Sequence, residues 1–293
     1  QLLQPLDDLL SSDLRQDLYP FAVQVGQFED QWVAVQFQAD LQHLAYRMDT
    51  VPQPPQTWRE LLDGQATYLF PVAGSEESVS DASLILYLSA GGPYDQAARL
   101  LALSEQPLLD LLMLYRDGSQ RQLIRPDVLT VNNIEASWVA FKTGSGDMTN
   151  ALASRYLVDR SAFPDFGYAA IPSSQGTPVT LSSGWALAIV TKDPARQAAA
   201  ARFIEWLLTA ENNGSWTRAA GYLPTRRAGL PSWGQGDPYA DFLAGQLEVA
   251  RFRPGGAYNI DVAQRLQIAI RDVLTAAASP EEAVAQALGS ESP

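Results

Sequence analysis

The stretch Gln31–Leu62, which reads QWVAVQFQADLQHLAYRMDTVPQPPQTWRELL, carries the signals that decide the fold. Its first half is an apolar, strand-like run that contains one carboxylate, Asp40. Its second half has a double proline, and then Thr57 and Glu60 at the spacing of a capping box, which predicts a helix start. A strand that bears one acid and runs directly into a new helical region suggests a crossover between two lobes. On that interpretation Asp40 lies at a cleft, within reach of a ligand.

The composition excludes several classes of function. The chain has 293 residues, of which 46% are hydrophobic and 18% charged, so it is long enough for two ordinary domains or one large one. Its net charge of −13 and lack of a basic run argue against nucleic-acid binding. The absence of cysteine and the single histidine, His43, exclude Cys-based and His-rich metal sites. We expect no metal and no cofactor, and we interpret His43 as a structural residue near a strand end.

Short strands alternating with helices predict an α/β fold. The expected strands lie at 32–37, 167–171 and 186–190, and two helices are expected at 82–89 and 108–115. Loops rich in Gly, Pro and Ser at 172–184 and 228–238 flank the block 185–227. This block is therefore expected to belong to a different lobe from its neighbours. No apolar run approaches the ~20 residues that cross a bilayer.

Helix starts are clearest in the second half of the chain. Asp193 and Pro194 supply an N-cap and a proline at the first helical position. The buried face of that helix is expected to consist of Ala199, Phe203, Trp206 and Leu207. The Asn-Asn-Gly sequence at 212–214 is expected to break the helix or to turn it into the next one. Ser279, followed by Pro280 and Glu282, predicts a further capped helix near the C-terminus.

Aromatic residues mark a candidate ligand site. The candidates are Trp138, Trp185, Trp216 and Tyr222. Trp and Tyr combine a broad apolar face with a polar group, which suits a sugar. Trp185 follows a Ser-Ser-Gly loop, where the backbone can approach a ligand closely. A core role stays open for each of these residues, and for Trp58 and Trp206 we favour it.

No motif of a known enzyme class stands out in the sequence. It contains no phosphate-binding G-x-x-x-x-G-K-[ST], no G-x-G-x-x-G, no G-x-S-x-G and no H-E-x-x-H. A carboxylate pair for glycoside hydrolysis stays open, because 33 acidic residues always offer pairs. We assign no catalytic residue. Arg226, Arg227 and Arg253 have the chemistry to clamp an acidic group, although solvated arginines are the default.

Several blocks, taken in order, resemble the family 1 extracellular solute-binding proteins, which are the receptors of sugar-importing ABC transporters. The blocks are L-x-P-L-D-D at Leu3–Asp8, Tyr46-Arg47-x-Asp49 followed by P-P-x-T-W-x-E-L, Ser137-Trp138, Gly184-Trp185 before an apolar strand, A-A-x-F-I-x-W-L at Ala200–Leu207, G-Y-L-P-T-R at 221–226 and the final S-P-E-E-A. Each block is weak alone, but the ordered set is specific and covers essentially the whole chain.

The resemblance implies a two-lobed, periplasmic-binding-protein-like fold of type II, with a ligand cleft at the hinge that closes by hinge bending. The N-terminal lobe would comprise residues 1–42 and 182–235, and the C-terminal lobe residues 43–181 and 236–293. By position, Asp40 resembles the family's ligand-binding carboxylate and Trp138 its sugar-stacking aromatic. Gly184 and Trp185 resemble its ligand-facing loop, and Tyr222 the tyrosine of its G-Y-L-P segment. Arg253 falls near the last crossover.

One departure from the family pattern concerns the start of the chain. Family members have strand–helix units ahead of the L-x-P-L-D-D block, and these are absent here, so we expect the first lobe to be incomplete. At roughly 30 residues per strand–helix–strand unit, about two or three strands are missing. Ligand contacts from that region cannot be assigned in this chain.

The sequence thus predicts an extracellular or periplasmic receptor that binds a sugar, oligosaccharide or related polyol and delivers it to membrane permease subunits. A lipid anchor, if there is one, would lie on a segment ahead of Gln1. Two alternatives stay open: a secreted carbohydrate-active enzyme that uses a carboxylate pair, and a sensor module for the same class of ligand. We expect no catalysis, no nucleic-acid partner and no transmembrane segment in this chain.

Overall fold

The computed structural model describes residues 2–28, 31–74, 79–233, 236–254 and 259–289, in which strands and helices alternate as the α/β prediction requires. The chain forms two compact units. Unit 1 comprises Gln1–Leu41, Ala153–Val158 and Leu181–Arg253, and unit 2 comprises Gln42–Leu152, Asp159–Thr180 and Pro254–Pro293. The lobe bounds predicted from the resemblance stay a prediction. Unit 1 differs from the predicted first lobe mainly because it includes residues 153–158 and 236–253.

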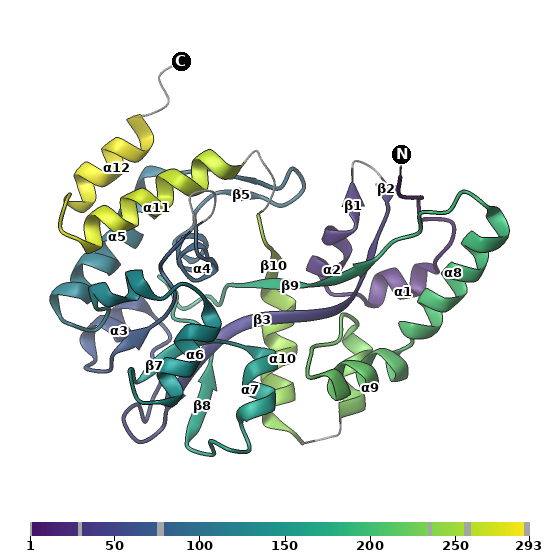
Figure 1. Ribbon diagram of the computed structural model, residues 1–293, viewed down its shortest axis with the longest axis horizontal. Coiled ribbons are helices and arrows are strands. Elements are labelled where there is room, and N and C mark those ends of the chain that lie inside the picture. Colours follow the sequence, from purple (N-terminus) through teal and green to yellow (C-terminus); the bar gives the residue numbers. More distant parts are fainter. Residues whose placement is uncertain (1, 29–30, 75–78, 234–235, 255–258, 290–293) are drawn as a thin grey trace. The chain divides into compact units, whose positions relative to one another are not determined.

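Unit 1 is built on the first half of a long strand, β3 (Val35–Arg47), which is the purple-blue strand in Figure 1. Its other strands are β1 (Gln27–Phe28), β2 (Gln31–Trp32), β9 (Thr180–Leu187), of which Leu181 onward lies in unit 1, and β10 (Ala250–Phe252). Its helices are α1 (Ser12–Asp17), α2 (Pro20–Val25), α7 (Ala153–Asp159, up to Val158), α8 (Pro194–Leu207), α9 (Ala210–Ala220), the short helix η2 (Arg227–Trp233) and α10 (Pro238–Val249).

Within unit 1, β3 pairs with β9 in antiparallel register from Val35 opposite Leu187 to Leu41 opposite Ser182. The register shifts between Gln36 and Gln38, which marks a β-bulge, and such bulges often lie beside functional sites. On the other side of β9 lies β10. The segment after α9 adds an isolated bridge, in which the backbone groups of Ala39 and Leu223 exchange two hydrogen bonds of 2.8 Å.

Unit 2 uses the second half of β3 for its sheet. Residues 42–46 of β3 pair with β7 (Met148–Leu152) and residues 44–47 pair with β8 (Phe166–Ala169), both antiparallel, while β4 (Tyr68–Leu69) runs parallel to β7. A separate hairpin consists of β5 (Tyr94–Asp95) and β6 (Leu100–Leu101). The helices are α3 (Trp58–Asp63), α4 (Asp81–Ser89), α5 (Glu105–Gln120), η1 (Pro126–Thr130), α6 (Ile134–Lys142), α11 (Ile260–Leu274) and α12 (Pro280–Gly289). Figure 1 shows α11 and α12 beside α5, where their apolar faces pack together.

Both predicted capping boxes form, which explains where their helices start. The Oγ1 of Thr57 accepts the backbone N–H of Glu60, and the Glu60 carboxylate accepts the backbone N–H of Thr57. Ser279 and Glu282 make the same reciprocal pair of bonds ahead of α12. The structural role predicted for Trp58 is also confirmed, because its ring is buried and its Nε1–H donates to the carbonyl oxygen of Pro172 at 3.0 Å.

Two predictions about the second half of the chain are wrong. The Asn-Asn-Gly sequence at 212–214 lies inside α9, because the break falls earlier, at Leu208 and Thr209, where Thr209 caps the new helix. The core role predicted for Trp206 is also wrong. Its side chain is 59% exposed and that of Phe203 is 56% exposed, since α8 buries Ala201 and Ile204 in unit 1 instead.

Candidate functional site

Asp40 lies on β3 in unit 1 and is almost completely buried. One carboxylate oxygen, Oδ1, accepts the backbone N–H groups of Leu41 at 2.9 Å and Ser154 at 3.1 Å. The other oxygen, Oδ2, accepts the hydroxyl of Ser154 at 2.5 Å. The carboxylate therefore attaches the first turn of α7 to β3. Because its oxygens are engaged inside unit 1, this structure gives Asp40 a positioning role, and its role as a ligand-binding acid stays a prediction.

The environment of Asp40 has an electrostatic consequence. Burial raises the pKa of the Asp40 carboxyl from 3.8 to about 6, because the ionised form loses its hydration. The hydrogen bonds from Ser154 and Leu41 and the positive charge of Arg155 oppose this rise, but they do not outweigh it. Asp40 therefore titrates nearer to neutral pH than an ordinary carboxylate does.

Gly184 and Trp185 lie on β9, directly across from β3. Gly184 pairs with Ala39 and Trp185 pairs with Gln38. Gly184 has φ = 149°, and a Cβ at this position would lie 2.2 Å from the carbonyl oxygen of Gln38, so only glycine fits. The indole of the next residue, Trp185, is 69% exposed. The position predicted for a ligand-facing aromatic is thus open to solvent.

Tyr222 lies near the same strands. It follows Gly221, which ends α9 in a left-handed conformation with φ = 74°, and its backbone N–H donates to the carbonyl oxygen of Thr217 at 2.8 Å. The next residue, Leu223, forms the bridge to Ala39. Tyr222 is half-buried, and through this bridge it lies in the same part of unit 1 as residues 38–40 of β3 and Gly184 and Trp185 of β9. These residues are called the cluster below.

Two further aromatic or basic candidates also belong to unit 1. Trp216, on α9, is 39% exposed and packs its ring against Phe37, with ring centroids 5.3 Å apart. Arg253 is half-buried and directly follows β10, the strand beside β9. Both candidates therefore lie near the strands that carry the cluster. Trp216 contacts β3, and Arg253 follows β10, which pairs with β9.

Trp138 lies in unit 2, on α6, where its ring is only 2% exposed. It stacks on Phe141, with ring centroids 5.6 Å apart, and meets the edge of Phe166. Its Nε1–H donates to Oδ2 of Asp159 at 2.7 Å, and Lys142 pairs with the same oxygen at 2.7 Å. Both faces and the polar edge of the indole are thus engaged. The structure accounts for Trp138 as a core residue, and the predicted sugar-stacking role has no exposed ring face to support it.

His43 has the structural role that its position predicted. Its ring is fully buried in unit 2, and Nδ1 lies 2.9 Å from the carbonyl oxygen of Leu44. Burial lowers the pKa of His43 to about 4, so the side chain is neutral at physiological pH.

Buried glutamines on β3 form part of the site that the sequence analysis missed. Gln36 donates through Nε2 to the carbonyl oxygens of Gln38 at 3.0 Å and Ser183 at 3.1 Å, which holds the bulge and the start of the Gly184 approach. Its Oε1 is buried and has no hydrogen-bond partner among the described residues. Alternation of glutamine with apolar residues at 36, 38 and 42 was the available signal. Ser154 had none, since it lies 114 positions from Asp40.

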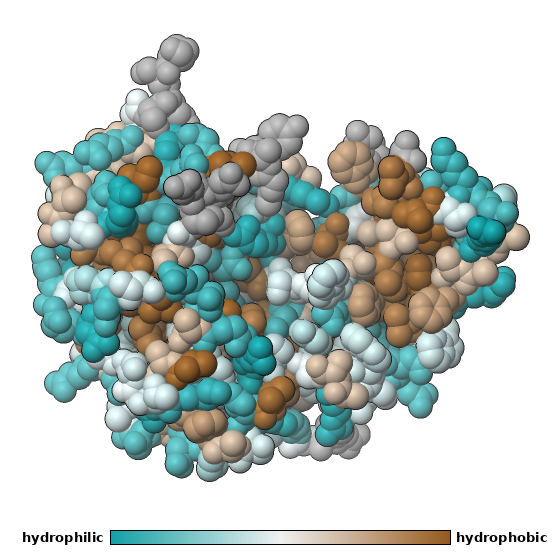
Figure 2. All heavy atoms as spheres, in the orientation of Figure 1, coloured by the Kyte–Doolittle hydropathy of each residue, from teal (hydrophilic) through white to brown (hydrophobic). Residues whose placement is uncertain are grey.

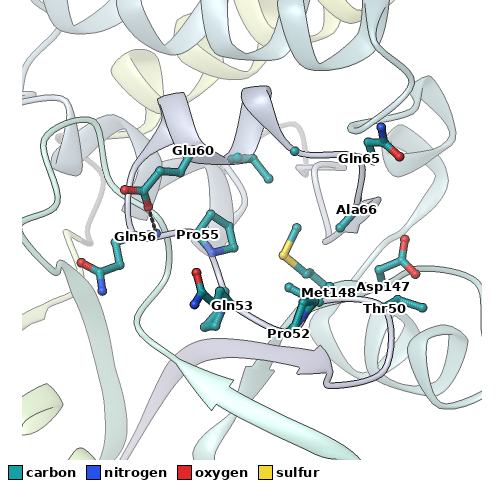
Figure 3. Close-up of a pocket in the computed structure, with 14 residues that line it drawn as sticks. Thr50, Pro52, Gln53, Pro55, Gln56, Glu60, Gln65, Ala66, Asp147 and Met148 are labelled. Atoms are coloured by element: carbon teal, nitrogen blue, oxygen red, sulfur yellow. Dashed lines mark hydrogen bonds between the residues drawn. The ribbon is translucent and has the colours of Figure 1, made fainter.

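A cavity of about 850 Å³ lies within unit 2, between the Thr50–Gln56 loop, α3 and the start of β7 (Figure 3). Its two carboxylates are already engaged, Glu60 by the backbone of Gln56 and Asp147 by Thr67. Burial alone would raise the pKa of Asp147, but the bonds from Thr67 and the charge of Arg47 outweigh it and hold that pKa below its ordinary value. None of the predicted site residues lines this cavity.

A second cavity of unit 2, of about 720 Å³, lies beside α11. Gln267 lines it and donates through Nε2 to the carbonyl oxygen of Val72 at 2.9 Å, while its buried Oε1 finds no hydrogen-bond partner in the described part of the chain. An amide oxygen without a partner is a ready acceptor for a ligand hydroxyl. Gln264 and Arg271 extend the polar lining along the same helix.

The described part of the chain contains neither a candidate metal site nor a candidate membrane-spanning helix. Over the described ranges, no group of three or more His, Asp or Glu side chains is arranged to hold a metal ion. In the same ranges no helix has the length and apolar character needed to cross a membrane.

Solved structures of similar fold include maltose-bound MalE3 from T. maritima, which is 21% identical, with a TM-score of 0.77 over 99% of this chain and 79% of that one. The cyclic α-maltosyl-1,6-maltose binding protein from Arthrobacter globiformis is 21% identical, with a TM-score of 0.81 over 97% and 78%. The GacH receptor of Streptomyces glaucescens, solved unliganded and with acarbose, is 19% identical, with a TM-score of 0.73 over 99% and 78%. At these identities the likeness shows the fold, which is that of the maltose-binding, periplasmic-binding-protein type.

Comparison with protein families is more specific. A search among curated proteins finds no match. The family model described as bacterial extracellular solute-binding protein matches residues 1–233, which is most of the chain. With the ordered blocks and the fold in agreement, the chain belongs to the family of bacterial extracellular solute-binding proteins.

Proposed function

We propose that this chain is the extracellular receptor of an ABC importer, that it binds a carbohydrate without chemical change, and that it delivers this ligand to the membrane permease. The family supports a solute-binding role. Similar folds in structures bound to maltose, maltotriose and acarbose support a saccharide of the maltose type as the ligand class. We infer a location outside the cytoplasm from the description of the family as extracellular. A lipid anchor is also part of the proposal.

The observation that carries the ligand class is the exposed indole of Trp185 beside Gly184. The exposed indole offers a flat apolar face and a polar N–H group, and the flat face matches the C–H face of a pyranose ring. In this proposal Trp185 stacks on the sugar and Tyr222 supplies a hydroxyl. Gly184 keeps β9 close to Gln38 of β3 beside Trp185, and Arg253 contributes donors.

Asp40 acts in this proposal as a positioning residue. By holding α7 against β3 through Ser154, its carboxylate fixes the strand that carries the cluster. Trp138 is assigned to the core of unit 2 and not to ligand binding.

Thermal unfolding in the presence of a saccharide panel tests the ligand class. The panel comprises maltose, maltotriose, acarbose and tagatose, which are the ligands bound in solved structures of similar fold. A ligand present at about 100 times its Kd adds about 2.7 kcal/mol to the stability of the folded chain, which is a readily measured shift. A panel that leaves the unfolding temperature unchanged contradicts the proposed ligand class.

A pair of variants tests whether the ligand binds at Trp185. Trp185→Ala is expected to weaken binding by about 1–3 kcal/mol, because a stacked aromatic face is lost. Trp206→Ala is the matched control, since this indole is 59% exposed in the same unit but lies on α8. Equal losses of affinity from both variants would contradict the assignment of Trp185.

Deletion of the gene tests delivery to the permease. If the protein delivers the saccharide, the deletion should abolish uptake of that saccharide.

A further inference from the structure

The bulge in β3 contains a buried amide that has no hydrogen-bond partner. Gln38 is only 4% exposed. Within the ranges that the structure describes, its side-chain amide makes no hydrogen bond, whereas the amides of Gln36 and Gln42 on the same strand do. Burial of an amide without a hydrogen bond costs stability, and such groups are rare in folded proteins. The amide of Gln38 is therefore a candidate to receive its partner from a ligand.

Gln38 lies on the same face of the sheet as Trp185. The two residues are directly opposite each other in the antiparallel β3–β9 pair, so their Cβ atoms lie about 5 Å apart on one face. The next pair on this face is Asp40 opposite Ser183, and the Asp40 carboxylate is already engaged by Ser154. Gln38 thus places an unpaired polar group directly beside the exposed indole.

Gln36 fixes the backbone of the bulge before any ligand binds. Its Nε2 donates to the carbonyl oxygens of Gln38 at 3.0 Å and Ser183 at 3.1 Å. Gly184 makes room for this amide, because a Cβ there would lie 2.5 Å from the same Nε2. The buried Oε1 of Gln36 has no partner among the described residues, so the bulge holds a second unsatisfied polar atom. A backbone held in this way allows Gln38 to bind a ligand without rearrangement of the strand.

The unpaired amide is more informative about the ligand than the apolar surface of unit 1. Figure 2 shows hydrophobic side chains gathered on unit 1 over α1 and α8, and such a surface does not specify the chemistry of its partner. An amide does, because it offers an acceptor oxygen and a donor N–H group side by side. Two adjacent hydroxyl groups on a sugar ring supply the complementary donor and acceptor.

We propose that the side-chain amide of Gln38 binds two adjacent hydroxyl groups of the sugar whose ring stacks on Trp185, and that it selects saccharides in which both hydroxyls are free. This rests on the carbohydrate-receptor function proposed above and adds the group that recognises the hydroxyls. Stacking on Trp185 differs little between sugars. Gln38 distinguishes them, because a site that hydrogen-bonds a hydroxyl rejects an analogue that lacks it.

Thermal unfolding of the unliganded full chain tests whether the amide is unpaired. Gln38→Met replaces the amide with an apolar group of similar shape, so it should raise the unfolding temperature by about 2–4 °C. Gln42→Met is the matched comparison on the same strand. Oε1 of Gln42 accepts Nδ2–H of Asn150 at 3.1 Å, and loss of this bond should lower the unfolding temperature. A Gln38→Met chain that is no more stable than the wild type would overturn the proposal, because the amide would then already have a partner.

Calorimetry with maltose tests the role of Gln38 in binding. Gln38→Met should weaken the affinity about tenfold to a hundredfold, since two hydrogen bonds to the sugar are lost. A residue with a merely structural role would not combine higher stability of the free chain with lower affinity. Val139→Met is the control for both measurements, because Val139 is 55% exposed on α6 of unit 2 and should change neither.

Mono-deoxy derivatives of maltose identify the hydroxyls that Gln38 binds. Removal of either hydroxyl should weaken binding to the wild type about tenfold and should have little effect on binding to Gln38→Met. Equal sensitivity of both proteins to every missing hydroxyl would overturn the proposal.

The outcomes separate this proposal from the receptor function. If Gln38→Met binds maltose as tightly as the wild type does, the assignment of Gln38 is wrong and the receptor function stands. If the wild type binds neither maltose nor any other saccharide of the panel, the receptor function fails and the role of Gln38 fails with it.

Discussion

Replacing Asp40 with asparagine should change how the stability of the protein depends on pH. The carboxylate is buried on β3, where burial raises its pKa from 3.8 to about 6. One pKa unit corresponds to about 1.4 kcal/mol, so this rise amounts to about 3 kcal/mol. The folded protein binds this proton more tightly than the unfolded chain does. The resulting stability is therefore fully present below pH 3.8 and is lost as the pH rises through about 6.

Asparagine removes this dependence because it does not titrate. The free energy of unfolding of Asp40→Asn, relative to the wild type, should rise by about 3 kcal/mol between about pH 3 and about pH 8. His43 has the opposite sign, because burial lowers its pKa to about 4, so its contribution is present above pH 6.5 and is lost as the pH falls through about 4. Both proteins contain His43, and its effect cancels in the difference.

Urea unfolding followed by tryptophan fluorescence measures this difference at each pH. Ser154→Ala provides an internal check. It removes a hydrogen bond that lowers the pKa of Asp40, so it should move the loss of stability to higher pH. A difference between wild type and Asp40→Asn that stays constant with pH would refute the reasoning, since the carboxylate would then not be buried in its ionised form.

Three shorter predictions concern packing and local structure. Trp138→Ala should lower the free energy of unfolding by about 3–5 kcal/mol and leave ligand affinity of the folded protein unchanged, as urea unfolding and calorimetry will measure; a selective loss of affinity would restore its sugar-stacking role. Gly184→Ala should destabilise unit 1 by more than about 2 kcal/mol, since its Cβ would meet the carbonyl oxygen of Gln38 at 2.2 Å; a variant with wild-type thermal stability would contradict this. Thr57→Ala should cost about 1 kcal/mol through loss of the cap of α3, and no change in unfolding would show that the cap is dispensable.

The family and the α/β class could be predicted from the sequence, because they depend on the order of short motifs, strands and helices along the chain. Capping boxes at Thr57 and Ser279 are local signals, and the structure forms both. The glycine before Trp185 was also informative, because its φ of 149° is one that other residues rarely adopt. These features depend on residues close to one another in sequence.

Contacts between distant residues could not be predicted in the same way. Asp40 bonds to Ser154, and nothing near Asp40 indicates that its carboxylate is engaged there. The apolar spacing on α8 predicted that the face with Phe203 and Trp206 is buried, and this was wrong. Spacing shows that a face is apolar but not what covers it, and the structure leaves this face open. Trp138 was assigned by position in the family pattern, whereas its neighbour three residues on, Phe141, is the packing partner that indicates a core role.

Isothermal titration calorimetry of maltotriose into the full chain, with analysis of the sugar afterwards, tests whether the protein is a carbohydrate receptor. A receptor should show saturable binding of one sugar per chain, recovery of the sugar intact, and weaker binding in Trp185→Ala. Release of reducing ends during the titration would instead support a carbohydrate-active enzyme. No heat of binding, either from maltotriose or from the other saccharides of the panel, would contradict the proposed carbohydrate-receptor function.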